Sequence, residues 1–177
     1  MDLHQYVDPV LGFVRAHAAW APFIVGFLAF GESLAFVSLV MPATTLLVAI
    51  GALVGAGALS FVPLWIAAAI GAALGDWLSY WLGEKFEGPI SRMWPLSRHP
   101  DLLPRGHAFV ERFGIAAIFI GRFFGPLRAI VPLVAGILRM PFWPFQIANF
   151  SSAFVWAAVL LAPGAYGYDY VTRFWPF

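Results

Sequence analysis

The chain has 177 residues, of which 62% are hydrophobic and only 11% are charged, and its formal net charge is +1. A soluble domain carries roughly 25% charged residues, so most of the outer surface of this protein is expected to be apolar as well. Nucleic acid is not an expected partner, because the ten Lys and Arg residues are spread thinly along the chain. The composition predicts one all-helical membrane domain over residues 1–177.

The sequence contains no cysteine, which excludes disulfide bonds, thiolate catalysis and cysteine metal sites. The four histidines, His4, His17, His99 and His107, show no close ligand spacing. We therefore expect neither a metal nor a cofactor.

Residues 1–18 are predicted to form an amphipathic helix on the membrane surface. Its apolar residues recur at helical spacing, and they are Leu3, Val7, Val10, Leu11 and Val14. A packed helix explains the same periodicity and stays open. No basic segment precedes a short apolar run, so a signal peptide is not expected.

Residues 19–83 form the predicted first half of the domain. Between Ala16 and Gly83 only Glu32 and Asp76 are charged, over a length that corresponds to about three spans of roughly 20 residues. The pattern predicts a membrane element from about Trp20, a break near Pro42, a return through Gly57, and a transmembrane helix over residues 63–83.

Residues 84–112 are the predicted polar central loop. They contain half of the basic residues of the chain, namely Lys85, Arg92, Arg98, Arg105 and Arg112. The positive-inside rule places this loop in the cytoplasm.

Residues 113–177 form the predicted second half, with apolar runs over residues 113–138 and 140–168. The first run is interrupted by Gly125-Pro126 and by Pro132. The halves resemble each other, because Gly31-Glu32 and Gly121-Arg122 are each followed by a proline ten residues after the charge, Pro42 and Pro132. Broken apolar segments at corresponding places are typical of a transporter repeat with its site at mid-membrane.

Arg122 and Arg128 lie in the apolar second half. An arginine at the centre of a membrane helix costs about 2.5–3.5 kcal/mol on insertion scales, so an acid, a water-filled cavity or an anionic ligand must offset the cost. A helix break at Gly125-Pro126 allows the two guanidinium groups to converge. Glu32 is the acid at the equivalent depth of the first half.

Two converging guanidinium groups favour a phosphate or a carboxylate, because each presents paired donors in a planar fork. The alternative is that Arg122 and Arg128 only pair with Glu32 and Asp76 and hold the halves together. Glu32 is interpreted as an ion-pair or proton-coupling residue. Asp76 is ranked below these three, since a solvated position near a helix end explains it equally well.

The run GRFFGPLRAIVPLVAG over residues 121–136 resembles the signature of the DedA family, also called the SNARE-associated or VTT-domain family. GESLAFVSLVMP, GDWLSYWLG and FQIANFSSAFVW support the resemblance, in the order and spacing of that family. Within these runs, Tyr80 and Asn149 are secondary candidate residues. The resembling segments cover most of the chain between Gly31 and Trp156.

The resemblance implies two re-entrant helical hairpins that meet at mid-membrane, in a multi-pass protein of the bacterial inner membrane. It also implies transport of an anionic lipid phosphate, such as undecaprenyl phosphate recycled for cell-envelope synthesis, or of a phospholipid. One departure matters: Thr44 stands where many bacterial members have a second acid. Transport coupled to H+ or Na+ and passive scrambling therefore both stay open. The oligomeric state is open as well, and a homodimer is one possibility.

The leading hypothesis is a flippase or scramblase in which Arg122 and Arg128 bind the lipid phosphate. The alternative is a proton- or sodium-coupled transporter of a small anion, and a purely structural membrane component is a third possibility. An enzyme is not expected, because all four histidines lie outside the apolar runs and no acid-phosphatase-like arrangement of Lys, Arg, Ser-Gly-His and a second His is present.

Overall fold

The computed structural model describes residues 16–34, 43–86, 101–124 and 127–174. The predicted amphipathic helix over residues 1–18 falls almost entirely outside this part of the chain, and so do Pro42, Gly125 and Pro126. Thr44 lies in a described helix, but its side chain is outside the described part.

Every regular element in the described ranges is a helix, which agrees with the predicted all-helical class. After a short 3-10 turn, η1 (Ala18–Trp20), come α2 (Ala21–Ser33), α3 (Ala43–Gly55), α4 (Phe61–Lys85), α5 (Leu102–Phe113), α6 (Ala116–Gly121), α7 (Leu127–Ile137) and α8 (Phe142–Phe174). Two segments, Phe61–Lys85 and Phe142–Gly167, are long and apolar enough to cross a membrane.

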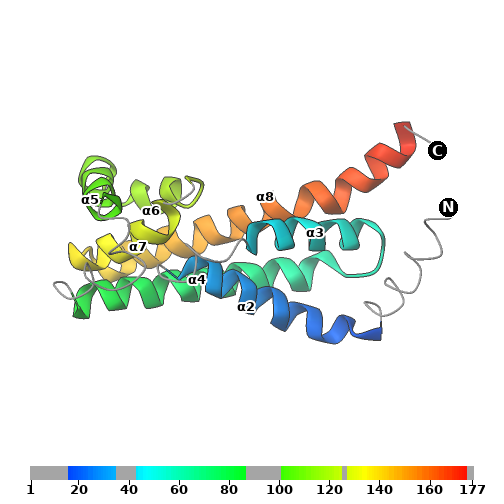
Figure 1. The fold of residues 1–177 in the computed structure, drawn as a ribbon, viewed down its shortest axis with the longest axis horizontal. Coiled ribbons are helices and arrows are strands. Elements are labelled where there is room, and N and C mark those ends of the chain that lie inside the picture. The colour runs from blue at the N-terminus through cyan, green and yellow to red at the C-terminus, as the bar shows by residue number, and fades with distance from the viewer. Residues whose placement is uncertain (1–15, 35–42, 87–100, 125–126, 175–177) are drawn as a thin grey trace.

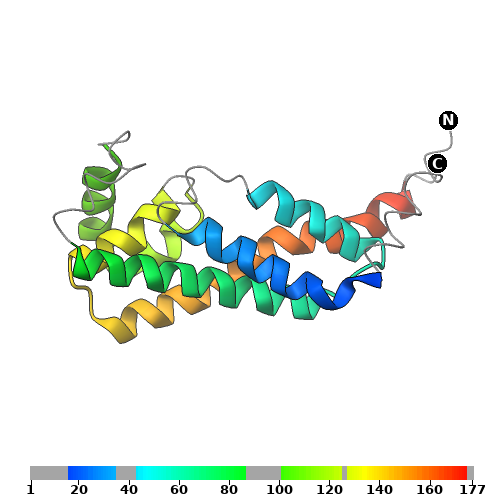
Figure 2. The ribbon, with the colours of Figure 1, turned by 60° about the horizontal axis from the view of Figure 1, so that its bottom comes forward.

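The long helices α4 and α8 form the axis of the molecule, and the shorter helices pack around them (Figure 1). Helix α2 packs against α4 of its own half. In contrast, α3 packs against α8, and α7 packs against α4, so each half contributes a helix to the other half (Figure 2). The two halves therefore share one interior.

Glycines allow these helices to approach closely. A Cβ atom at Gly71 would lie 2.1 Å from the carbonyl oxygen of Gly26, at the contact of α4 with α2. Glycine also lies at the two contacts between the halves. Gly51 of α3 lies against α8, and a Cβ atom at Gly136 of α7 would lie 1.9 Å from the carbonyl oxygen of Tyr80 in α4. Small residues at helix contacts are the usual way to pack helices in lipid.

Helices α3 and α7 also end in the same way. At the end of α3, Gly57 has φ +70°, and the amide of Ala58 donates to Leu53 O. At the end of α7, Arg139 has φ +52°, and the amide of Met140 donates to Ala135 O. This is the Schellman pattern, which closes a helix with one residue of left-handed backbone. A shared turn between the short helix and the following long helix agrees with the predicted repeat.

Two predictions about breaks require correction. The segment 84–112 is not a loop throughout, because α4 continues to Lys85 and α5 begins at Leu102. Pro132 does not interrupt its segment, because it lies inside α7. A proline removes one backbone hydrogen bond to the residue four positions earlier, and α7 continues through Pro132 to Ile137 despite that loss.

The buried residues form two apolar clusters along the axis. One cluster surrounds α7 and includes Tyr80 and Ala148. The other surrounds α3 and includes Ala73 and Ala153. On α4 and α8, the buried polar residues Asp76, Ser79, Asn149 and Ser152 lie between the parts of each helix that belong to the two clusters. The polar site is thus enclosed between two apolar cores.

Candidate functional site

The first buried ion pair joins Arg122 to Asp76. Arg122 follows the last residue of α6, and Asp76 lies in the middle of α4. Nη2 of Arg122 donates to Oδ2 of Asp76, and both side chains are at most 5% exposed. Because a buried charge is costly unless it is paired and hydrogen-bonded, this pair explains how both residues are accommodated among apolar helices.

Polar residues of α8 complete the surroundings of Arg122. Its Nε donates to Ser152 Oγ at 2.9 Å, and its Nη2 also donates to Asn149 Oδ1 at 2.6 Å. The side-chain nitrogen Nδ2 of Asn149 donates to Ala73 O at 2.9 Å and to Gln146 Oε1 at 3.2 Å. Asn149 therefore connects α8 with α4 and fixes the direction of the Arg122 side chain.

The second buried ion pair joins Arg128 of α7 to Glu32 of α2. Nη1 of Arg128 donates to Glu32 Oε1 at 2.7 Å. The guanidinium carbon lies 4.6 Å from the ring centroid of Trp156, over its face. A guanidinium over an indole face gains a cation–π attraction, which is worth more where water is excluded. Trp156 itself is buried.

The turn between α6 and α7 places the two arginines. The carbonyl oxygen of Phe124 accepts from the amides of Leu127 and Arg128 at 2.9 and 3.3 Å, which starts α7 shortly after α6 has ended. The two arginines thus lie on either side of this turn, each in a buried ion pair with an acid of the first half.

Each arginine retains a donor that no described residue satisfies. These atoms are Nη1 of Arg122 and Nη2 of Arg128, and both are buried. A buried donor without an acceptor costs about 1–3 kcal/mol, and more for a charged group. The site therefore holds two charged N–H groups with capacity for a further acceptor, and an anion provides several acceptor oxygens.

The four predicted charged residues are therefore brought together as two ion pairs, each joining the first half to the second. Asp76 is buried at 4% exposure, so the interpretation of a solvated interface residue is wrong. Tyr80 donates from its hydroxyl to Met140 O at 2.6 Å and stacks on Phe145, so it connects α4 with the start of α8. Asn149 lies in the site and contacts Arg122.

Gln146, Ser152 and the contact of Trp156 with Arg128 were not predicted. With Asn149 they recur every three or four residues along α8 and share one face of the helix. Uncharged polar residues at this spacing, in a helix without charge between residues 140 and 168, are the signal that identifies the polar face.

The VTT domain, a protein family, matches residues 41–166, which is most of the chain. The match includes three of the four charged site residues, Asp76, Arg122 and Arg128. The chain belongs to the VTT-domain (DedA) family.

Inner membrane protein YabI of Escherichia coli K12 is 38% identical over 152 residues, which are 86% of this chain and 60% of YabI. An uncharacterized membrane protein, BU139, of Buchnera aphidicola from Acyrthosiphon pisum is 34% identical over 86% of this chain and 59% of its own length. Inner membrane protein YghB of Escherichia coli K12 is 32% identical over 70% of this chain and 57% of YghB.

This chain thus spans about 60% of the length of the first two relatives. No solved structure matches the chain. The names of the DedA relatives, with the two spanning helices, identify this DedA chain as a multi-pass protein of the inner membrane.

Proposed function

We propose that this DedA protein moves an anionic lipid phosphate across the inner membrane, with Arg122 and Arg128 as the groups that bind the phosphate. The observation that carries the proposal is the pair of buried guanidinium groups, each with one unsatisfied N–H donor. A phosphate offers several acceptor oxygens and negative charge, and guanidinium groups bind it through paired donors.

The ion pairs supply a mechanism for exchange. In the structure Glu32 and Asp76 neutralise the arginines, and both pairs are buried. A phosphate that enters the site replaces a carboxylate as the partner of an arginine, so that the arginine never remains uncompensated in a low-dielectric interior. Glu32 is the carboxylate expected to be displaced, and its protonation, or a bound Na+, would couple transport to an ion gradient.

The short helices are expected to form the two re-entrant hairpins. Helices α2 and α3 have 13 residues each and α7 has 11, whereas a span needs about 20 residues. Paired short helices that turn back at mid-membrane would bring Glu32 and Arg128 to the same depth. Such backbone breaks are tolerated in the membrane only where protein or water covers them.

A coupled transporter of a small anion is the alternative, because the same arginines would serve it. The tail of the substrate distinguishes the two functions. An enzyme is not proposed: no histidine is among the described residues that form the hydrogen bonds given above for either arginine, and a nucleophile would need such a base.

The test is transbilayer movement of a labelled polyprenyl phosphate in proteoliposomes, by wild type, Arg128→Ala and Arg105→Ala. Arg105 is a surface residue whose side chain is 71% exposed, and it serves as the matched control. We expect movement by wild type and Arg105→Ala, and its loss in Arg128→Ala. Equal movement by all three proteins, or none above empty vesicles, would contradict the proposal. Movement of inorganic phosphate instead of the lipid would favour the alternative.

A further inference from the structure

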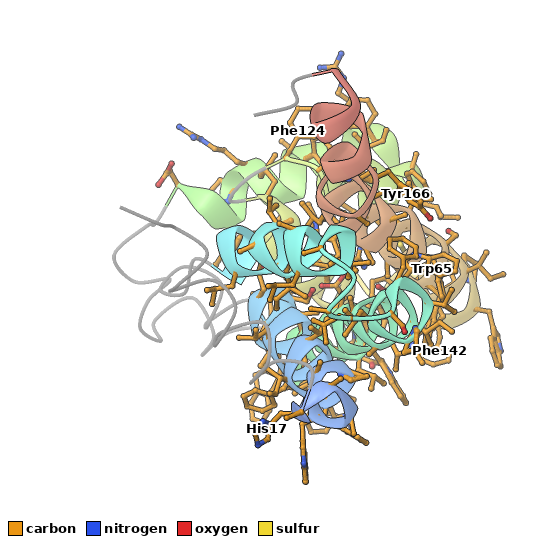
Figure 3. The ribbon with its side chains drawn as sticks, turned by 90° about the vertical axis from the view of Figure 1, so that its right-hand side faces the viewer. His17, Trp65, Phe124, Phe142 and Tyr166 are labelled. Atoms are coloured by element: carbon orange, nitrogen blue, oxygen red, sulfur yellow. The ribbon has the colours of Figure 1, made fainter. Side chains whose placement is uncertain are left out.

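A shallow groove lies on the outer face of the bundle between α4 and α8. It has a volume of about 400 Å³, and its lining residues are Trp77, Phe142, Trp143, Gln146, Ile147 and Phe150. Phe142 lies at the rim of the bundle (Figure 3), and Trp143 and Ile147 are 73% and 70% exposed. Because the chain is a membrane protein, we expect this apolar face to meet lipid, and Gln146 is the polar residue among the lining residues.

Gln146 connects the groove to the buried arginine. Its Oε1 accepts from Asn149 Nδ2 at 3.2 Å, and Asn149 Oδ1 accepts from Arg122 at 2.6 Å. Two hydrogen bonds thus lead from the groove to a guanidinium group. Because the oxygen of the Gln146 amide faces Asn149, its NH2 group is the donor left for the groove.

The direction of this amide identifies the kind of ligand. An amide donor that faces an apolar surface without an acceptor is unfavourable, because the hydrogen bond it makes in water is lost. A concave apolar surface with a single polar group is typical of a site that binds an apolar body and orients one polar end. A lipid with an anionic head group has this composition, since its chain suits the aromatic lining and its head accepts from Gln146.

We propose that the groove between α4 and α8 binds one hydrocarbon chain of an anionic lipid, with the head group at Gln146. The groove is the lateral entrance to the polar site, and the hydrogen bonds of Gln146 and Asn149 lead inward to Arg122. This inference rests on the proposed lipid-phosphate transport, for which it supplies the route of entry and a binding position for the tail.

Photolabelling tests the groove without any transport measurement. A phosphatidic acid with a diazirine in its acyl chain is irradiated with the wild-type protein in vesicles, and the adducts are mapped by mass spectrometry. We expect adducts to concentrate on Trp143 and Ile147 rather than on Val155 and Val159, which are also exposed on α8. The corresponding uncharged diacylglycerol is expected to label all four positions about evenly. Even labelling by both lipids would overturn the proposal.

Two matched variants test whether the groove serves transport. Ile147→Trp adds volume inside the groove, and Val159→Trp adds the same side chain on the lipid-facing side of α8 outside it. With polyprenyl phosphate as the substrate, we expect Ile147→Trp to raise KM at least fivefold and Val159→Trp to leave it within twofold of wild type. Thermal unfolding of both variants in detergent checks that they fold. Equal KM values for the two folded variants would overturn the role of the groove.

These outcomes separate the groove from the proposed function. Transport that depends on Arg128 but is unaffected by Ile147→Trp contradicts the groove alone. Preferential labelling of the groove by phosphatidic acid, with no transport by wild type, contradicts the proposed function and supports the groove as a lipid site. Since the chain has no cysteine, Ile147→Cys also reports a competing occupant. A disulfide-linked dimer of this variant in vesicles would show that a second copy covers the groove, and would overturn the proposal.

Discussion

Arg122 and Arg128 differ in how firmly the protein holds them. Arg122 has four hydrogen bonds, to Asp76, to Ser152, and to the side chain and the carbonyl oxygen of Asn149. Arg128 has one to Glu32 and lies over Trp156. We therefore expect Arg122 to maintain the geometry of the site and Arg128 to exchange its partner during transport.

Lysine substitutions should separate these roles, because lysine keeps the charge but loses the fork of donors. Arg122→Lys should lower the melting temperature in detergent, since a single ammonium group cannot replace the four hydrogen bonds that the guanidinium makes to α4 and α8. Arg128→Lys should leave the melting temperature within about 2 °C, which corresponds to less than about 1 kcal/mol for a chain of this size, and reduce lipid-phosphate transport at least tenfold. A large loss of stability in Arg128→Lys would contradict this division.

Removing one partner of the Asp76–Arg122 pair should be strongly destabilising. Asp76→Asn leaves a buried guanidinium without its counter-charge, and breaking a buried pair costs about 3–5 kcal/mol. The double variant Asp76→Asn with Arg122→Gln should recover part of that loss, because no buried charge remains. Equilibrium unfolding in detergent measures both.

The surface pair between Asp101 and Arg105 provides the control for this prediction. Their side chains are 53% and 71% exposed, and an exposed pair contributes about 0–1 kcal/mol. Asp101→Asn should therefore change the free energy of unfolding very little. A loss in Asp76→Asn as small as in Asp101→Asn would show that the buried pair contributes little to folding.

At this scale the charged residues of the site were predictable, because a charge in an apolar segment needs a partner. The pairing was only partly predictable. Glu32 and Asp76 were both available to the arginines, and the choice depends on how α2 and α4 pack. Gln146 and Ser152 were missed since an uncharged polar residue in a membrane helix costs less than a charge and attracts less notice.

Among the helices, the contact of α2 with α4 depends on glycine. A Cβ atom at Gly71 would lie 2.1 Å from the backbone oxygen of Gly26, whereas one at Gly167 of α8 would have no atom within 4 Å. Gly71→Ala should therefore cost about 1–3 kcal/mol, as expected for overpacking of a close contact. Gly167→Ala should be neutral or slightly stabilising. A thermal melt of both variants tests this, and equal melting temperatures would contradict it.

The turns after α3 and α7 offer a reciprocal pair of variants. Gly57 has φ +70° and open space around it, so Gly57→Ala adds only the strain of left-handed backbone, about 1–2 kcal/mol. Arg139 has φ +52°, so Arg139→Gly should remove similar strain and stabilise the protein. The melting temperature in detergent should fall in Gly57→Ala and rise in Arg139→Gly. A shift in the same direction for both would show that the turns are not equivalent.

Helix boundaries were predictable where glycine and proline accumulate. The spanning helix α4 lies where the pattern predicts it, within two residues at each end. Pro132 was misread, because a proline is compatible with a helix when the surrounding packing holds it, and α7 is packed against α4. Sequence pattern identifies the residue that can break a helix, but the tertiary contact decides whether it does.

Across the whole molecule, the exchange of α3 and α7 between the halves makes each half dependent on the other. Leu47 of α3 is buried in the cluster that includes Leu161 of α8, and Leu133 of α7 is buried in the cluster that includes Tyr80 of α4. The sequence indicated two similar halves, but a pattern along one chain does not show which helix contacts which. An isolated half would expose these apolar faces and the charged site residues.

This exchange predicts that the halves remain associated after the chain is cut. A protease site introduced into the polar segment 87–100 separates a fragment with α2, α3 and α4 from one with α5 to α8. After cleavage in detergent, the two fragments should co-purify through a tag on either one, because two ion pairs and the exchanged helices connect them. Each fragment expressed alone should aggregate or be degraded, since its partner helices are missing. Asp76→Asn combined with Glu32→Gln should weaken co-purification, whereas the surface variant Asp101→Asn should not. Separation of the cleaved wild-type fragments would show that the connecting segment, rather than the shared interior, holds the halves together.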